Sequence, residues 1–269
     1  MRRGVLALVP LLIGLVIIAF QFFGAEKQVV PITGREQRVG MTDAEQIQLG
    51  AEVYDQVLAE VAPQVIESGP QAELVRRVAE RVIAVGEADK PDFDWEVTLV
   101  DDPQSNAFCL PGGKIVVYSG ILGPAVDEAG LATVMAHEVA HAIAEHGAER
   151  ILKQQLTDSA VQIAAGSLSQ DPEQYRQIVG LLGAGAQVGL SLPWGRAQES
   201  EADHIGLVYM ARAGYDPQAA VGFWQRMGEA AGEDRPPEYL STHPDSDTRV
   251  EDIQGWMAEA QAEYRPPPP

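Results

Sequence analysis

An apolar run opens the sequence. From Gly4 to Phe23 the chain carries no charged residue. A helix of about twenty residues, at about 1.5 Å per residue, spans about 30 Å, which is the thickness of the hydrocarbon core of a bilayer. Arg2 and Arg3 precede the run, and positive charge on this side keeps the N-terminus in the cytoplasm. The pattern predicts a transmembrane helix over residues 1–24, with the rest of the chain on the far side of the membrane.

A cleaved signal peptide is the alternative for this segment. The apolar region of a signal peptide is usually about 7–15 residues long and ends in small residues. Here the run is longer, and the sequence Gln-Phe-Phe-Gly at residues 21–24 is a poor cleavage site. We therefore expect an uncleaved anchor.

Residues 25–41 are polar, contain a proline and two glycines and lack a helical period, so we expect a linker there. Helical periodicity begins at residues 42–61, where Thr42 and Glu45 form a capping box ahead of the first apolar positions. A second helix begins at Pro70, a favoured first helical residue, and ends at Gly86.

The hydrophobic period changes between residues 94 and 118. Alternation at 94–99 predicts a strand, and the β-rich runs 106–110 and 114–118 flank a Pro-Gly-Gly turn, which is typical of a hairpin. Helical patterns then return, in a segment that ends near Gly147 and in later segments. The expected fold class is α+β, mostly helical with a small β-sheet. We expect one domain over residues 42–262, followed by an extended proline-rich tail over 263–269.

Residues 178–192 form a second apolar stretch, with four glycines among fifteen residues. It is too short to span a membrane comfortably and too rich in glycine for a rigid helix. Two interpretations remain: a buried or mobile segment beside a cleft, and an interfacial contact with a membrane.

Composition narrows the possible functions. The chain has 269 residues and a formal net charge of −20, from 39 acidic and 19 basic residues. Nucleic acid is excluded as a partner, because phosphate binding needs a concentrated positive surface. The single cysteine, Cys109, excludes an internal disulfide framework and a cysteine-based zinc site. All five histidines lie between positions 137 and 243.

The helix before Gly147 contains the sequence His137-Glu138-Val139-Ala140-His141, an HExxH motif. His137 and His141 are one turn apart, so both imidazoles lie on one face and can bind one ion. Glu138 lies about 100° around the helix, from where it can reach a metal-bound water without binding the metal. The alternative is a helix whose histidines form hydrogen bonds within a core.

A catalytic zinc needs a third protein ligand on another element. Glu199 and Asp203 lie four residues apart on a later predicted helix and share one face. Glu199 can bind zinc while Asp203 accepts the second N–H of a ligand histidine. Glu201 lies about 200° from Glu199, so it cannot serve the same ion. The alternative is a solvated acidic face.

These motifs together resemble the gluzincin metallopeptidases. The similarity is stronger to the membrane-linked group that includes the CAAX prenyl proteases and the bacterial BepA-like and HtpX-like quality-control proteases. It covers about residues 40–255, and the matching stretches are SNAFCLPGGKIVVYSGIL, RAQESEADHIG and STHPDSDTR. The resemblance implies a gluzincin-type fold, one Zn²⁺ per chain on His137, His141 and Glu199, Glu138 as general base and Asp203 as the associated acid.

Two further residues match the family pattern. His243 is either a donor to the oxyanion, a fourth zinc ligand that keeps the resting enzyme closed, or a loop histidine without a role. Arg249 either orients substrate or pairs with an acid. The remaining histidines, His146 and His204, are expected at the surface.

The resemblance also implies that Asn106, Ala107 and Phe108 belong to an edge strand that lines the cleft. Such an edge can add a peptide substrate as an extra strand, which tolerates many sequences. An ordinary covered strand is the alternative for each of these residues.

The sequence therefore predicts a zinc-dependent endopeptidase that cleaves unfolded or misassembled envelope proteins. A membrane-anchored, chaperone-like binding protein with little proteolysis is the alternative, and a scaffold with a chance HExxH is a third. Intact Glu138 favours the enzyme, because a pure binding protein needs no general base. The expected location is the bacterial inner membrane, single-pass and with the catalytic domain in the periplasm, or a soluble periplasmic form after signal cleavage. The oligomeric state is left open.

Overall fold

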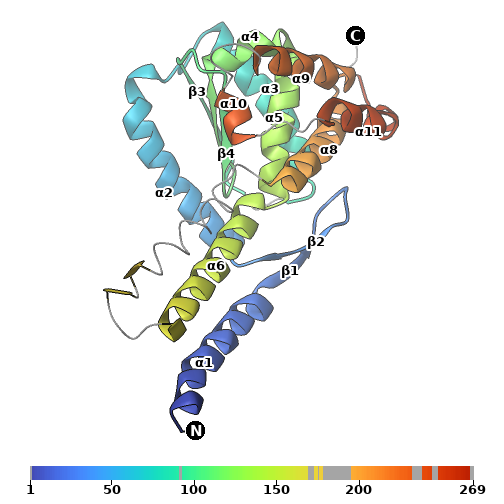
Figure 1. The fold of residues 1–269 in the computed structure, drawn as a ribbon. Coiled ribbons are helices and arrows are strands. Elements are labelled where there is room, and N and C mark those ends of the chain that lie inside the picture. Colours follow the sequence, from blue (N-terminus) through green and yellow to red (C-terminus); the bar gives the residue numbers. More distant parts are fainter. Residues whose placement is uncertain are drawn as a thin grey trace. The chain divides into compact units, whose positions relative to one another are not determined.

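The computed structural model describes residues 2–90, 93–168, 173–174, 176–177, 195–231, 238–243 and 248–266 (Figure 1). The chain divides into two compact units. The first comprises Met1–Val29, Glu36–Thr42 and Ala148–Pro193, and the second Val30–Arg35, Asp43–Gly147 and Trp194–Pro269. The glycine-rich stretch 178–192, the residues 244–247 before the last helix and the final three prolines lie outside the described residues.

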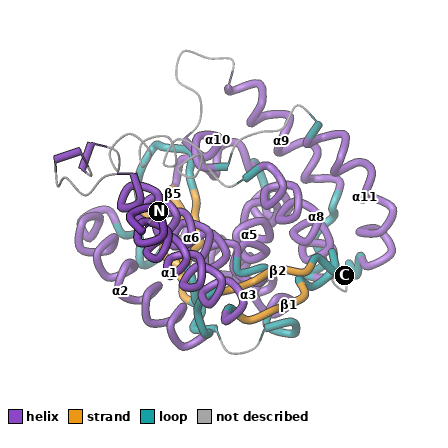
Figure 2. The backbone as a smooth tube through the Cα atoms, turned by 60° about the horizontal axis from the view of Figure 1, so that its bottom comes forward, coloured by secondary structure: helices purple, strands orange, loops and turns teal. Residues whose placement is uncertain are grey.

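The first unit contains a long helix and a two-stranded ribbon, together with most of a second helix. These elements are α1 (Arg2–Gly24), β1 (Glu26–Val29), β2 (Glu36–Val39) and α6 (His146–Leu168). The strands β1 and β2 lie side by side (Figure 2). They pair antiparallel, with Glu26 opposite Val39. Among the described residues, no helix combines the length and the apolar character needed to cross a bilayer.

Residues 25–41, expected to form a linker, thus contain two paired strands. Each strand is only four residues long and mostly polar, so its alternation is too brief to stand out in the sequence. In β2 the buried side chains are those of Gln37 and Val39, and the strand alternates as a half-buried strand does.

The second unit carries the remaining elements. Its helices are α2 (Asp43–Val61), α3 (Pro70–Gly86), α4 (Leu122–Ala125), α5 (Glu128–Ile143), α8 (Arg196–Arg212), α9 (Gln218–Ala231), α10 (Glu238–Thr242) and α11 (Arg249–Glu263). Its strands are β3 (Glu96–Val100), β4 (Ala107–Leu110) and β5 (Lys114–Tyr118). A mostly helical chain with a small sheet agrees with the α+β expectation.

The sheet of the second unit has the order β3-β5-β4. The central strand β5 runs parallel to β3 and antiparallel to β4, and the expected hairpin is present. Its turn needs glycine, because Gly112 and Gly113 have φ of 77° and 98°. Strand β4 lies at one end of the strand order, which is the edge position expected for residues 106–110.

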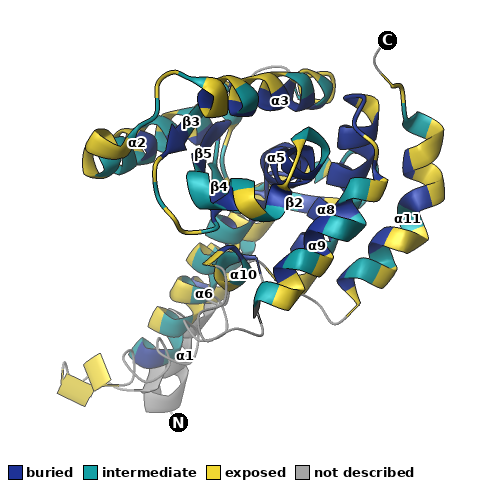
Figure 3. Ribbon diagram, turned by 90° about the horizontal axis from the view of Figure 1, so that it is seen from above, coloured by how far each residue is buried: buried dark blue, intermediate teal, exposed yellow. Residues whose placement is uncertain are grey.

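Helix α5 lies at the centre of the second unit. Every residue from Gly130 to Ile143 is buried, as expected of a helix that is apolar on all sides (Figure 3). It packs between α3 and α8, and the sheet lies against it through β4. Gly206 lets α8 approach closely, since a Cβ there would lie 3.0 Å from the backbone of Ala136 and His137.

The end of α5 differs from the sequence prediction. The helix stops at Ile143 and not near Gly147, which lies inside α6. Two turn residues, Ala144 and Glu145, separate the helices, and Glu145 is a residue other than glycine with φ of 50°. Glu145 is buried, and its carboxylate accepts hydrogen bonds from Gln46 and Lys90. These contacts hold a backbone conformation that few side chains adopt.

Candidate metal centre

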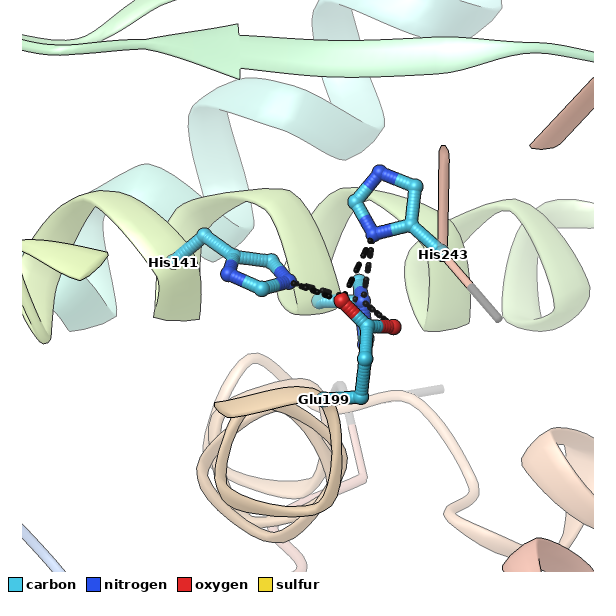
Figure 4. Close-up of side chains that lie close together, drawn as sticks. His141, Glu199 and His243 are labelled. Atoms are coloured by element: carbon cyan, nitrogen blue, oxygen red, sulfur yellow. Dashed lines mark hydrogen bonds and ion pairs between the residues drawn. The ribbon is translucent and has the colours of Figure 1, made fainter. Parts of the chain in front are cut away.

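Four buried side chains from three segments converge on one point. His137 and His141 lie on α5, Glu199 lies on α8, and His243 directly follows α10; Figure 4 shows three of them. The Nε2 atoms of His137 and His141 lie 3.0 Å apart, and His243 Nδ1 lies 3.2 Å from His137 Nε2. The Glu199 carboxylate completes the group, 3.3 Å from His141 Nε2 and 3.2 Å from His243 Nδ1.

These separations match those of ligands around one tetrahedral ion. Ligand atoms about 2.0–2.1 Å from a tetrahedral metal lie about 3.3–3.4 Å from one another. The four candidate ligand atoms all lie within 4.8 Å of one another, and each residue is at most 2% exposed. Three imidazoles with one carboxylate are also a donor set that suits a transition metal. The residues present therefore fit a metal ion.

The pKa values of the cluster indicate that it holds a positive charge beside the Glu199 carboxylate. Burial disfavours a charged His141 and lowers its pKa. Burial also acts against a charged His137, but hydrogen bonds to Asp203 and Glu199 outweigh it and raise the pKa of His137 to about 10. Burial alone would raise the pKa of Glu199, yet its hydrogen bonds to the three imidazoles lower it. The anion Glu199 is thus matched by a positive charge within the cluster, and a metal cation can supply that charge.

Asp203 and Arg249 fix the outer side of the cluster. Asp203 Oδ1 lies 2.9 Å from His137 Nδ1, the nitrogen that points away from the cluster. Arg249 donates from Nη2 to Glu199 Oε2 at 2.8 Å, and its Nε forms an ion pair with Asp203 Oδ2, also at 2.8 Å. The guanidinium also lies 3.9 Å from the ring centroid of Trp224. Of the two roles considered for Arg249, pairing with an acid is the one present here.

Glu138 is buried beside the cluster but is not part of it. Its Oε1 accepts a hydrogen bond of 2.8 Å from Tyr239 Oη and lies 3.6 Å from His243 Nε2. Burial raises the pKa of Glu138, although the neighbouring histidines and Tyr239 act in the opposite direction. A carboxylate with a raised pKa can take up a proton more readily than an exposed one. The sequence analysis did not identify Tyr239, and only its position four residues before His243 could have drawn attention to it.

His146 was expected at the surface, and this prediction is wrong. The residue is fully buried, and its Nδ1 lies 2.8 Å from Nδ1 of His141. Its Nε2 lies 3.0 Å from Glu201 Oε2. Glu201 therefore forms a hydrogen bond with His146 and is not one of the four candidate ligands. By contrast, His204 is partly exposed, stacks on Trp256 and pairs with Glu259.

The residues expected to bind substrate lie at or next to the edge strand β4. Ala107 is fully buried, and Asn106 Oδ1 accepts a hydrogen bond from the Ala107 backbone N–H. Phe108 packs in a small apolar cluster that includes Tyr54 and Val116. Cys109 is partly buried, and burial raises the pKa of its thiol.

Comparison with known proteins gives one family and several related proteases. Residues 70–257 match peptidase family M48. The mitochondrial metalloendopeptidase OMA1 of Schizosaccharomyces pombe is 36% identical over 242 residues, which cover 89% of this chain and 69% of that protein. The human mitochondrial metalloendopeptidase OMA1 is 32% identical over 260 residues, covering 92% of this chain and 48% of that protein.

A bacterial relative has a name that describes a different role. The beta-barrel assembly-enhancing protease of Escherichia coli is 28% identical over 238 residues, which cover 86% of this chain and 48% of that protein. The chain spans about half the length of the human and E. coli proteins. The matched residues include the whole of α5 and α8, which carry three of the four candidate ligands. The metallopeptidase expected from the HExxH helix is confirmed, and the chain belongs to peptidase family M48.

Proposed function

We propose that this chain is a zinc-dependent endopeptidase. The observation that carries the proposal is the convergence of His137, His141 and Glu199 on one point, with the buried carboxylate of Glu138 alongside. These residues fit the ligand set of a catalytic zinc, which takes three protein ligands and keeps one position for water or substrate. When bound, zinc lowers the pKa of its water toward about 7 and polarises the scissile carbonyl.

Three further side chains have separate roles in the proposed mechanism. Glu138 takes a proton from the attacking water and later passes it to the leaving amine. Asp203 accepts the Nδ1–H of His137, which keeps the Nε2 lone pair of that imidazole toward the metal. Arg249 holds both carboxylates in place, Glu199 through a charge-assisted hydrogen bond and Asp203 through an ion pair.

His243 is proposed as a fourth ligand in the resting state. Its Nδ1 lies at ligand-to-ligand distances from both His137 and Glu199, which supports this role over that of a loop histidine. A histidine in the fourth position occupies the place that water or substrate needs. Substrate binding therefore requires His243 to leave, and the oxyanion-donor role remains the alternative once it has moved.

Protein chains that expose backbone are the proposed substrates. The edge strand β4, which begins with Ala107 and Phe108 directly after Asn106, can pair with an extended peptide. The name of the E. coli relative refers to assembly of β-barrels, and we propose unfolded or misassembled envelope proteins as the substrate class here. The apolar run within residues 1–24 supports a membrane anchor with the catalytic domain in the periplasm.

Glu138→Gln tests the proposal directly. Glutamine keeps the size of the side chain but cannot accept the proton, so we expect stoichiometric zinc with casein degradation reduced by about 10²–10⁴-fold. Glu128→Gln, on the same helix and paired with Arg77, is the matched control and is expected to keep full activity. Metal analysis and casein degradation are measured on all three proteins. A wild type without stoichiometric metal, or a Glu138→Gln variant as active as the wild type, contradicts the proposed mechanism.

A further inference from the structure

A line of polar contacts leads away from the candidate metal site through His141. His141 Nε2 faces the cluster, and His141 Nδ1 lies 2.8 Å from His146 Nδ1. The other nitrogen of His146, Nε2, lies 3.0 Å from Glu201 Oε2. Glu201 in turn accepts hydrogen bonds of 2.6 Å from Thr33 Oγ1 and from Arg35 Nε.

The metal site at one end of this line and the Glu201 carboxylate at the other determine the tautomers of His141 and His146. A histidine that binds a metal through Nε2 carries its proton on Nδ1. His141 therefore donates from Nδ1, and His146 must accept at Nδ1, which leaves its own proton on Nε2. That Nε2–H points at the Glu201 carboxylate, an acceptor. Each link has one donor and one acceptor, so the line fits the state in which His141 is a metal ligand.

The backbone brings His146 to this position. On an uninterrupted helix, His141 and His146 would lie about 140° apart and their rings would not meet. The left-handed residue Glu145 interrupts the helix, and a new helix, α6, begins at His146. The rings of His141 and His146 meet there, with their centroids 4.9 Å apart. Both rings are fully or almost fully buried, so water does not compete for the contact.

The far end of the line is held by a separate segment of the second unit. Thr33 and Arg35 belong to Val30–Arg35, which lies 166 residues or more from Glu201 in the sequence. Arg35 Nε and Glu201 Oε2 form an ion pair in which the carboxylate is only 6% exposed. Two donors thus fix the carboxylate that accepts the hydrogen bond from His146 Nε2–H.

We propose that His146 is a positioning residue for the ligand His141. Glu201 holds His146 in place through a hydrogen bond, and Thr33 and Arg35 hold Glu201 in the same way. The inference rests on the proposed function, because it assigns these groups to the orientation of a metal ligand. The line sets the tautomer and ring orientation of His141, as a hydrogen-bond partner behind a metal-bound imidazole does. Asp203 does the same for His137 from the opposite side, so each histidine of the HExxH motif has its own partner.

The test compares two substitutions at His146. Alanine removes the acceptor atom Nδ1. Asparagine supplies another acceptor, because its Oδ1 lies close to the position of Nδ1 in histidine. We expect His146→Ala to weaken zinc affinity by about 10–100-fold and His146→Asn to recover most of that loss. His204→Ala is the matched control, since His204 also pairs with a carboxylate, 2.8 Å away, but makes no contact with the cluster. It is expected to bind zinc as the wild type does.

Zinc affinity is measured by competition with a chelator, and the visible spectrum of the Co²⁺-substituted protein reports on ligand geometry. We expect the Co²⁺ spectrum to change in His146→Ala and to return toward the wild-type spectrum in His146→Asn. A purely structural role would lower the melting temperature of the metal-free protein without this pattern. Unchanged zinc affinity in His146→Ala, or a folded His146→Asn variant that recovers nothing, overturns the inference.

If His146→Ala does not fold, the double substitution Thr33→Ala with Arg35→Ala tests the proposed positioning role instead. Both side chains are partly exposed, so their loss leaves the core intact. We expect weaker zinc binding in the same direction, and unchanged binding overturns the inference. A wild-type protein that takes up no zinc contradicts the proposed function itself, which separates the two failures.

Discussion

Arg249 holds two carboxylates with one guanidinium. Glu199 and Asp203 are both buried. Glu199 accepts a hydrogen bond of 2.8 Å from this side chain, and Asp203 Oδ2 forms an ion pair with its Nε, also at 2.8 Å. Two neighbouring buried anions repel each other, and neither has enough water around it to be screened. The planar fork of arginine reaches both at once, whereas the ammonium of lysine is a single point of charge.

Replacement of Arg249 by alanine therefore leaves two buried anions short of positive charge. We expect Arg249→Ala to lower the free energy of unfolding by about 3–5 kcal/mol in the presence of a chelator. Added zinc restores part of the loss, because the metal supplies positive charge to the same carboxylates. Urea unfolding with and without zinc measures both effects. Arg212→Ala, which breaks a half-exposed pair with Glu263, is the control and costs no more than about 1 kcal/mol. Equal losses for the two variants would mean that Arg249 is not the main counter-charge.

His243 gives a prediction with two readouts of opposite sign. As a fourth ligand it adds to zinc affinity and at the same time fills the position that substrate needs. We expect His243→Ala to bind zinc more weakly and to degrade casein faster than the wild type when zinc is in excess. Chelator competition and the casein assay measure the two properties on one preparation. Slower hydrolysis at unchanged zinc affinity would assign His243 to oxyanion stabilisation instead.

At the scale of elements, the site depends on how closely α8 approaches α5. The two helices carry three of the four candidate ligands, so their separation sets the distance from Glu199 to the histidines. Gly206 is a point of close approach, where a Cβ would lie 3.0 Å from backbone atoms of Ala136 and His137. Backbone atoms in a packed helix cannot shift independently.

Gly206→Ala is therefore expected to push the two helices apart. We predict a loss of about 1–3 kcal/mol in the free energy of unfolding, together with weaker zinc binding. Gly255→Ala on α11 is the matched control, because no atom lies within 4 Å of its Cβ position. That substitution gains about 0.5–1 kcal/mol from helix propensity. Thermal unfolding of both variants gives the comparison, and a stabilised Gly206→Ala variant would refute the close packing.

Local sequence signals predicted the regular elements well. The capping box at residue 42, Pro70 and the Pro-Gly-Gly turn each lie where α2, α3 and the β4–β5 hairpin begin or turn. These signals act within one turn of a helix or strand, so they are legible in a single sequence. The spacing of HExxH likewise needs only one straight helix.

The boundary of α5 was not predictable by the same means. Gly147 has the residue type of a helix terminus, but the left-handed residue is Glu145. What holds Glu145 there is a pair of side chains, Gln46 and Lys90, that lie 55 to 99 residues earlier in the chain. Since the helix was expected to continue to Gly147, His146 was placed about 140° from His141 and its role was missed.

At the scale of the whole molecule, the candidate ligands tie together parts of the sequence that are far apart. His137 and His141 come from α5, Glu199 from α8, and His243 from the end of α10, a spread of more than one hundred residues. An ion that binds only the assembled site stabilises the folded chain by an amount that grows with its concentration relative to the dissociation constant. Without the ion, Glu199 has the guanidinium of Arg249 and a protonated imidazole as its counter-charges.

Removal of the metal is therefore expected to lower the stability of the catalytic unit as a whole. At free zinc 1,000 times the dissociation constant, the bound ion contributes about 4 kcal/mol, so a chelator lowers the melting temperature by several degrees. Calorimetry with zinc and with a chelator measures the shift. Glu138→Gln shows the same shift as the wild type, because Glu138 lies beside the four ligands and is not one of them. Glu199→Gln shows a smaller shift, since it removes the only anionic ligand of the cluster. If the shift instead disappears in Glu138→Gln and persists in Glu199→Gln, the ion binds to a different set of residues.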